Sequence, residues 1–402
     1  MKNNSKTSYR LAVVIFFFIN GFLYANLTGR LPELKGFFGV SNSTLGTMLF
    51  MTAIGALVAM PLTGWLTTRY SSGKLTIWTG LLFCCAVPLI PLSNEVWTGR
   101  VFFFFTGFFS GAMDITMNGQ AVFVERAYNK TIMSSFHAAY SIGMALGAGS
   151  GALFATWHLA LRPHLLAVAL LSLIALALVS PLITSNQPPR LQTQKEKHAT
   201  RRIPTLIWLI AIIAFCGMTG EGSIVDWSAI YVNTVVGTTK AFSALAVGAF
   251  ATAMTIGRLL GDRIIDRFGK RTVLFTSCAA AIAGLSLALL VVSPITALAG
   301  FFLVGAGLSN VVPVIYSTAG NIPGIEPAAG IAIASTVGYT GFFVGPPSIG
   351  YLSDSFGLRI GLCFTLLLWV LMLAFISIVM RPSTRCGFSL TASHPHPQNE
   401  AL

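Results

Sequence analysis

The chain contains 402 residues, of which 54% are hydrophobic and 9% are charged, and its formal net charge is +13. This composition is typical of a polytopic membrane protein and excludes a soluble multidomain chain. No Walker A sequence, nucleophile elbow, zinc-ligand set or dinucleotide fingerprint occurs, so we expect neither an enzyme nor a primary pump, and no metal or cofactor.

Uncharged stretches long enough to cross a membrane recur along the chain, since a membrane helix needs about 20 apolar residues. In chain order they are 11–29, 36–68, 75–94, 131–161, 163–189, 203–220, 272–325, 327–353 and 360–380. The stretch 272–325 is long enough for two helices, and the segments 96–122 and 241–264 each add one more. The sequence therefore predicts an all-α membrane protein with twelve transmembrane helices and both termini on one side.

The basic residues are distributed unequally between the two sides of this predicted topology. With both termini in the cytoplasm, only six of the 25 Lys and Arg residues lie on the opposite side: Arg30, Lys35, Arg100, Arg162, Lys240 and Arg359. This asymmetry predicts a multi-pass membrane protein with both termini cytoplasmic. A basic inner face opposed to anionic membrane lipids accounts for the net charge without a nucleic-acid partner.

A polar segment rich in Pro, Gln and basic residues divides the predicted helices into two sets of six. We expect an N-terminal six-helix bundle over 1–184, a cytoplasmic linker over 185–202, a C-terminal bundle over 203–382 and a disordered cytoplasmic tail over 383–402. We expect the chain to act as a monomer.

The two predicted halves repeat each other at a nearly constant offset. Thr-Arg-Tyr at 68–70 and Asp-Arg-Phe at 266–268 are 198 positions apart, as are Gly107 and Gly305. Matches at one offset on corresponding helices indicate duplicated six-helix halves. Duplicated halves with a central linker resemble the major facilitator superfamily of secondary transporters.

The loop Asp-Arg-Phe-Gly-Lys-Arg at 266–271 resembles the D-R-F-G-R-R loop of that superfamily. The resemblance implies gate roles for Asp266 and Arg267, because the acid can cap a helix start and pair with Arg when the protein faces outward. Arg69 is the first-half counterpart and follows Thr68, where the family usually has Asp. A basic loop with a turn glycine is the simpler alternative.

Three carboxylates fall inside predicted membrane helices, where each costs roughly 2.5 to 3.5 kcal/mol: Asp114, Glu221 and Asp226. Asp114 and Asn118 share a helix face, and the segment 111–118 resembles the fourth helix of the fucose permease branch. The resemblance implies that Asp114 couples transport to protons, although the first helix here lacks the acid of that branch. The alternative is a buried acid bonded to a neighbouring helix or to an Arg.

Glu221 lies among three glycines past the middle of its helix, which indicates a locally broken helix lining a midplane site. We expect Glu221 to be the second proton-coupling acid and to contact the solute. Asp226 follows it by five residues, about 140° around a helix, so the two acids are not expected to face one cavity. Asp226 is instead predicted at an outer gate or an interface.

Three further strings resemble the YbjJ-like branch of bacterial inner-membrane major facilitators. They are Glu-Gly-Ser with Asp-Trp at 221–227, Arg30 with Pro32, and Tyr-Ser-x-Gly at 140–143. The resemblance spans nearly the whole chain and implies location in the bacterial inner membrane. We place Arg30 with the gate residues. The branch has no firmly assigned substrate.

Uncharged polar and aromatic side chains complete the predicted solute site, which helices 1, 4, 5, 7, 10 and 11 would line. With Glu221, its residues are Asn20, Tyr24, Asn118, His137, Tyr140, Asn310, Tyr316 and Tyr339. Such groups suit a hydroxylated or zwitterionic solute better than a large lipophilic cation. Each can equally be a helix–helix contact, and His137 either a gate or proton-path residue or a packing residue.

The sequence therefore predicts a secondary transporter that moves a small polar solute, with a sugar favoured, by alternating access and in symport with protons. Helix 5 has Gly-Ala-Gly at 147–149 where drug and proton antiporters of the superfamily have a Gly-Pro motif. This favours import, and proton-coupled efflux of drugs or metabolites is the alternative. A sensor or scaffold that binds solute without moving it is the alternative from another class, and it predicts dispensable intramembrane acids.

Overall fold

The computed structural model describes residues 3–128, 132–183, 204–323 and 327–380. These residues form α-helices and two short 3-10 helices, and there is no strand among them. The all-α fold predicted from the sequence is therefore confirmed. The predicted linker 185–202 and tail 383–402 lie outside the described residues, so those boundaries stay predictions.

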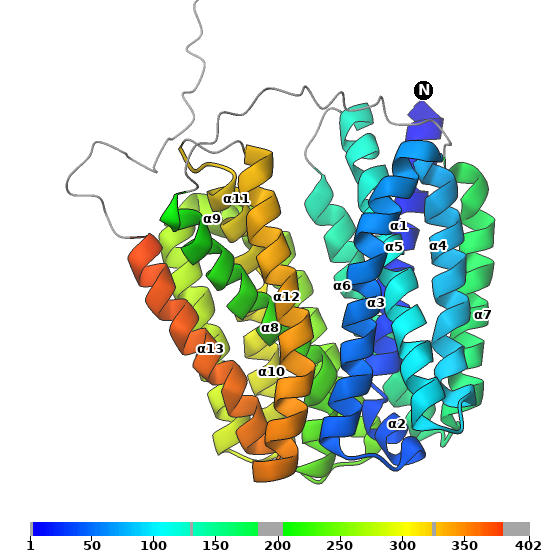
Figure 1. Cartoon of the computed structure of the whole chain (residues 1–402), viewed down its shortest axis with the longest axis vertical. Coiled ribbons are helices and arrows are strands. Elements are labelled where there is room, and N and C mark those ends of the chain that lie inside the picture. The colour runs from blue at the N-terminus through cyan, green and yellow to red at the C-terminus, as the bar shows by residue number, and fades with distance from the viewer. Residues whose placement is uncertain (1–2, 129–131, 184–203, 324–326, 381–402) are drawn as a thin grey trace, which may run out of the picture.

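The first half of the chain forms seven α-helices. They are α1 (Asn3–Thr28), α2 (Leu31–Phe38), α3 (Asn42–Arg69), α4 (Ser72–Ala86) continued by η1 (Val87–Leu92), α5 (Val96–Tyr128), α6 (Met133–Thr156) and α7 (Leu161–Val179) continued by η2 (Ser180–Leu182). The short helix α2 follows α1 at the far end of the bundle and does not cross it (Figure 1).

The second half forms six α-helices. They are α8 (Thr205–Thr234), α9 (Lys240–Leu290), α10 (Pro294–Leu308), α11 (Val311–Ala319), α12 (Pro327–Phe356) and α13 (Leu358–Val379). Gly269 divides α9 into two crossings, because its φ of +76° is a left-handed conformation that only glycine adopts readily. Gly269 is therefore a turn glycine between two membrane helices, which both the gate interpretation of loop 266–271 and its simpler alternative contain.

The two halves form separate bundles that stand side by side (Figure 1). In the first bundle α1 packs on α6 and α3 on α5, and in the second α8 packs on α12 and α9 on α10. A Cβ at Gly107 would overlap the Thr52 carbonyl, and a Cβ at Gly305 would overlap the Phe250 carbonyl. Equivalent close contacts at the 198-residue offset agree with duplicated halves.

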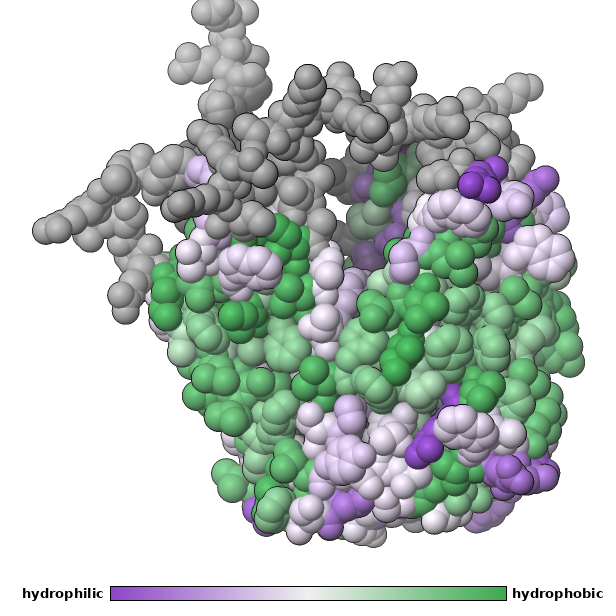
Figure 2. All heavy atoms as spheres, in the orientation of Figure 1, coloured by the Kyte–Doolittle hydropathy of each residue, from purple (hydrophilic) through white to green (hydrophobic). Residues whose placement is uncertain are grey.

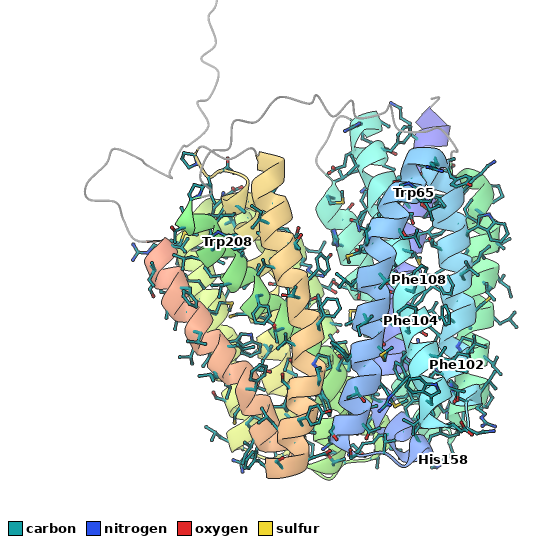
Figure 3. The ribbon with its side chains drawn as sticks, in the orientation of Figure 1. Trp65, Phe102, Phe104, Phe108, His158 and Trp208 are labelled. Carbon is teal, nitrogen blue, oxygen red and sulfur yellow. The ribbon has the colours of Figure 1, made fainter. Side chains whose placement is uncertain are left out.

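Nine helices of the described segments are long and apolar enough to span a membrane. Counting α9 twice and adding α5 and α12 gives the twelve crossings that the sequence predicts. A hydrophobic band covers the middle of the molecule, with hydrophilic residues toward its ends (Figure 2). Exposed Trp65 and Trp208 lie near one end, where an aromatic belt is expected at a membrane interface (Figure 3).

The two ends of the molecule differ in how the bundles meet. We call the end where α1 begins the N-terminal face, and the end that carries α2 the α2 face (Figure 1). The bundles contact each other through α3 with α12 and α6 with α9. Near the α2 face α3 and α12 touch backbone to backbone, with Gly46 against Pro346, whereas Figure 2 shows a hollow between the bundles at the N-terminal face.

Helix α8 is continuous, so the broken helix predicted around Glu221 is wrong. The glycines beside it serve helix packing instead. A Cβ at Gly222 would lie 2.6 Å from the Phe342 ring of α12, and one at Gly220 would overlap the Trp369 ring of α13. Glycine therefore provides room for aromatic side chains without interrupting the backbone hydrogen bonds of α8.

Candidate functional site

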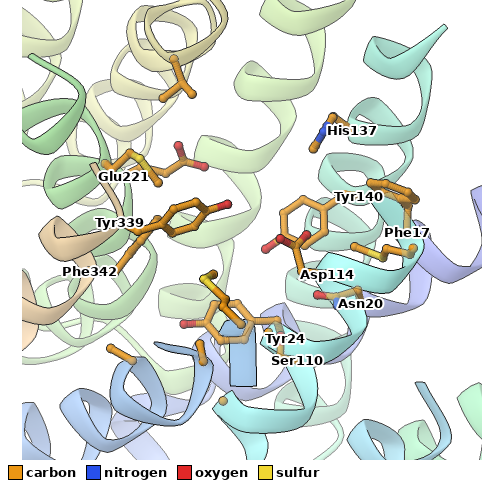
Figure 4. Close-up of a pocket in the computed structure, with 18 of the residues that line it drawn as sticks. Phe17, Asn20, Tyr24, Ser110, Asp114, His137, Tyr140, Glu221, Tyr339 and Phe342 are labelled. Atoms are coloured by element: carbon orange, nitrogen blue, oxygen red, sulfur yellow. The ribbon is translucent and has the colours of Figure 1, made fainter. Parts of the chain in front are cut away.

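A cavity of about 530 Å³ lies between the two bundles and is lined by both of them (Figure 4). Its wall comes from α1, α3, α5 and α6 in the first half, and from α8, α9, α11 and α12 in the second, with Asn310 just before α11. The predicted helices 1, 4, 5, 7, 10 and 11 correspond to α1, α5, α6, α8, α10 with α11, and α12, and each of them contributes to this wall. Helices α3 and α9 join them, because each runs along the interface between the bundles.

Asp114 projects from α5 into this cavity (Figure 4). Asn118, one turn further along α5, donates from Nδ2 to Asp114 Oδ1 at 3.0 Å and to the Asp114 carbonyl at 2.8 Å. Asn118 itself is not part of the cavity wall, and its amide contacts the acid in this structure. No Lys or Arg of the described chain forms an ion pair with Asp114.

Glu221 of α8 forms the second acidic point of the cavity, and it has a cationic partner. Arg258 of α9 lies with Nη2 at 3.4 Å from Glu221 Oε1, and its Nη1 donates to Ser141 Oγ of α6 at 2.9 Å. Arg258 therefore joins an acid of the second bundle to a hydroxyl of the first. This guanidinium is therefore a polar link between the bundles within the cavity wall.

Asp226 also lines the cavity, so the prediction that it and Glu221 would not face one cavity is wrong. The cavity extends along α8 and between both bundles. It is wide enough for both Glu221 and Asp226 to line it, although they are about 140° apart around the helix. Asp226 is 5% exposed, and the Tyr24 side chain of α1 lies close to its carboxylate in the same cavity wall. Its Oδ1 has no hydrogen-bond partner among the described residues. The Tyr24–Asp226 pair links the two bundles.

Apart from Asn118, the uncharged residues predicted for the solute site lie in the same wall. They are Asn20, Tyr24, His137, Tyr140, Asn310, Tyr316 and Tyr339. Asn20 is 4% exposed and its Nδ2 has no partner in the described chain, whereas the His137 ring packs edge-on against Phe17. Figure 4 shows the Tyr339 hydroxyl pointing across the cavity toward Asp114. Donors and acceptors from both bundles thus converge on one space.

Arg30, predicted as a gate residue, lies instead inside the first bundle. It is 3% exposed, pairs with Glu33, and donates to the Leu159 carbonyl at 2.9 Å. Its Nη1 lies 2.7 Å from His164 Nδ1, and because Arg only donates, this nitrogen accepts. Each of these partners belongs to the first half of the chain.

The loop residues predicted for the inner gate lie at the N-terminal face. Asp266 and Arg267 are exposed, and Arg267 lies over the ring of its neighbour Phe268 at 5.4 Å. Arg69 is also exposed and lies over the Trp65 ring at 4.2 Å. These residues are therefore free of the central cavity in this conformation.

Sequence reasoning missed two charged residues of the cavity, Arg258 and Asp262. The sequence places Arg258 among the basic residues of the cytoplasmic side, because it lies near one end of the predicted membrane segment 241–264. The spacing of Arg258, Asp262 and Ile265 at intervals of four and three was the available signal, since it places the three on one helix face. All three line the cavity.

Two helical bundles around a central cavity that contains acids and other polar groups define a multi-pass transporter and not an enzyme. The chain matches the description of the Major Facilitator Superfamily over residues 13–346 and belongs to this superfamily. An MFS-type transporter of Yersinia pestis is 32% identical over 363 residues, which are 90% of this chain and 93% of that protein. Membrane protein MosC of Rhizobium meliloti is 31% identical over 361 residues, or 90% and 87%.

Two solved structures show the same fold. A mutant of the nucleoside transporter NupG has a TM-score of 0.76 with 12% identity, covering 93% of this chain and all of that one. A bacterial homologue of the human lysosomal transporter Spinster, in an inward-facing and unoccupied conformation, has a TM-score of 0.72 with 13% identity, covering 94% and 98%.

Proposed function

We propose that the protein imports a small polar solute, with a sugar favoured, in symport with protons across a bacterial inner membrane. The observation that carries the proposal is the position of Asp114, an acid without a cationic partner in the described chain, in a cavity between two bundles. An ionised carboxylate is costly there, and a proton or a bound solute that neutralises it lowers the cost of closing the cavity around it.

The arrangement of the bundles supports alternating access. The cavity is closed toward the α2 face by the contact of α3 with α12, and it opens toward the N-terminal face (Figure 2). The asymmetry of the basic residues predicts that the N-terminal face is cytoplasmic. With that orientation this conformation faces inward, and rocking of the two bundles about the cavity would expose it to the outside.

Glu221 is proposed as the partner acid in the second bundle. Its ion pair with Arg258 is at 3.4 Å and is open to the cavity, so a proton or a solute hydroxyl can compete for either member. Arg258 also holds Ser141 of the other bundle, so a change at Glu221 alters a contact between the bundles. Occupation of the site is thereby linked to their relative position.

The other groups of the wall favour a hydroxylated solute. Unpaired Asn20 Nδ2 and the hydroxyls of Tyr140 and Tyr339 offer hydrogen-bond donors and acceptors at several points around one cavity. A sugar presents hydroxyls in many directions and can satisfy them together, and the tyrosine rings offer faces for its C–H groups. The wall also contains apolar side chains, which is typical of small-molecule sites.

The principal test neutralises Asp114. In proteoliposomes, Asp114→Asn should lower the accumulation of solute driven by an imposed proton gradient by at least about 10-fold. Solute exchange without a gradient should be retained. Glu95→Gln, which removes an exposed acid just before α5, is the matched control and should accumulate solute like the parent. If Asp114→Asn accumulates solute normally, Asp114 is structural and the coupling mechanism is wrong.

The solute class is tested by thermal unfolding of the purified protein with sugars, amino acids, organic acids and lipophilic cations. A ligand that binds only the folded state raises the unfolding temperature. A free ligand concentration of about 100 times its Kd adds about 2.7 kcal/mol to the free energy of unfolding. We expect the largest shift with a sugar or another small hydroxylated solute. A response confined to lipophilic cations would favour efflux, and binding without any transport would favour a sensor.

A further inference from the structure

The end of α12 meets the beginning of α3 at the α2 face, and a carboxylate bridges the two helices. Asp354 lies in the last turn of α12, in the second half of the chain. Its Oδ1 accepts from the backbone N–H of Asn42 at 2.9 Å, and its Oδ2 accepts from that of Ser43 at 2.9 Å. Both donors belong to the first turn of α3, in the first half.

This contact is a helix cap supplied by the opposite bundle. The first N–H groups of a helix have no partner inside it, and negative charge is favoured beside them. In α3 the N–H of Thr44 is capped locally by Ser41 Oγ at 3.2 Å, whereas those of Asn42 and Ser43 receive their acceptors from Asp354. The start of α3 is therefore satisfied only while α12 stays beside it.

The surrounding packing keeps the two helices close enough for this cap. A Cβ at Gly350 would lie 2.6 Å from the Asn42 carbonyl oxygen, and a Cβ at Gly46 would lie 2.6 Å from the Pro346 carbonyl oxygen. Lys35 of α2 donates to the Asn42 side chain and contributes a cation near Asp354. The cap is thus the outermost part of a tight contact between the two bundles.

We infer that Asp354 is a gate residue: its carboxylate caps α3 in the conformation that is closed at the α2 face, and the cap is lost when the bundles separate there. It favours the conformation that opens at the N-terminal face. The inference rests on the alternating-access part of the proposed function and is independent of the solute and of proton coupling.

The matched comparison is Glu125, which makes the same kind of cap inside one bundle. Its Oε1 accepts from the backbone N–H groups of Ile132 and Met133 at 2.7 and 2.8 Å. Loss of the carboxylate leaves two helix N–H groups without an acceptor at either cap. Only loss of the Asp354 cap changes the balance between conformations, because only that cap joins the two halves.

The test measures from which side of the membrane the cavity is accessible. A cysteine introduced at Ala53 in the cavity wall is labelled with a membrane-impermeant maleimide from either face of oriented vesicles, with the unsubstituted chain as background. Asp354→Asn should raise the ratio of labelling from the α2 face to labelling from the N-terminal face by roughly 3- to 10-fold, the size of one lost cap. Glu125→Gln should leave the ratio unchanged.

A second variant removes a donor and keeps the acid. Asn42→Pro deletes one of the two N–H groups at the first position of α3, where proline suits a helix, and should shift the ratio in the same direction. Combined with Asp354→Asn, it should add less than its separate effect. Unchanged ratios in both single variants, or equal shifts with Glu125→Gln, would overturn the inference. Neither solute nor a proton gradient is used, so a failed symport assay leaves this result standing.

Discussion

At the scale of single residues, charge balance distinguishes the acids of the cavity. Asp114 is held by Asn118 of its own helix, Asp226 by Tyr24 across the interface, and Glu221 by Arg258. Each acid therefore has a different contact to lose. Glu221 differs from the other two because its partner Arg258 also contacts Ser141 of the other bundle.

Arg258 is the residue whose removal tests that link. Arg258→Gln leaves Glu221 without its cation and deletes the hydrogen bond to Ser141, and should lower the free energy of unfolding by roughly 1 kcal/mol because the pair is partly exposed. Arg258→Gln with Glu221→Gln should lose less than the first change alone. Arg263→Gln, an exposed arginine on the same helix, is the control in thermal unfolding. A double variant less stable than Arg258→Gln would contradict the pairing.

At the scale of the elements, glycine sets how closely helices approach inside each bundle. Gly143 of α6 faces α1 so closely that a Cβ would overlap the Phe18 carbonyl oxygen. Gly149 of the same helix is exposed and has nothing within 4 Å of that position. Gly143 therefore permits the close contact of α6 with α1, whereas Gly149 has no such packing contact.

Alanine substitutions separate these roles. Gly143→Ala should destabilise the protein by about 1–3 kcal/mol, because α6 must move away from α1. Gly149→Ala should be neutral or slightly stabilising, since alanine favours a helix over glycine by up to about 1 kcal/mol. Unfolding temperatures of the two purified variants provide the measurement. Equal temperatures would mean that the close contact of α1 with α6 carries no special constraint.

At the scale of the whole molecule, the orientation of the helices in the membrane determines to which side the cavity opens. A reporter fused after Thr193 should be cytoplasmic, and one inserted near Thr238, in the connection between α8 and α9 at the α2 face, should be periplasmic. Paired activity reporters that function on only one side of the membrane provide the measurement. The reverse labelling would overturn the orientation and would make this conformation outward-facing.

The sequence by itself determined the class of the molecule. Apolar stretches of membrane length, the basic asymmetry and the 198-residue repeat depend only on composition and spacing, and they predicted twelve crossings in two related bundles. The polar residues predicted for the solute site, other than Asn118, lie in the wall of one cavity, because the helices that carry them border the interface between the bundles.

Only the tertiary structure decided which residues meet across the bundles. The glycines around Glu221 predicted a broken helix, but aromatic neighbours on α12 and α13 account for them, and no local pattern names those neighbours. From the sequence, Arg258 is one of several basic residues on the cytoplasmic side. The tertiary structure shows that it contacts Ser141 of α6 and Glu221 of α8. Asp354 is 312 residues from Asn42, and only the packing of α12 on α3 makes it a cap, since the donors and the acceptor lie on different halves of the chain.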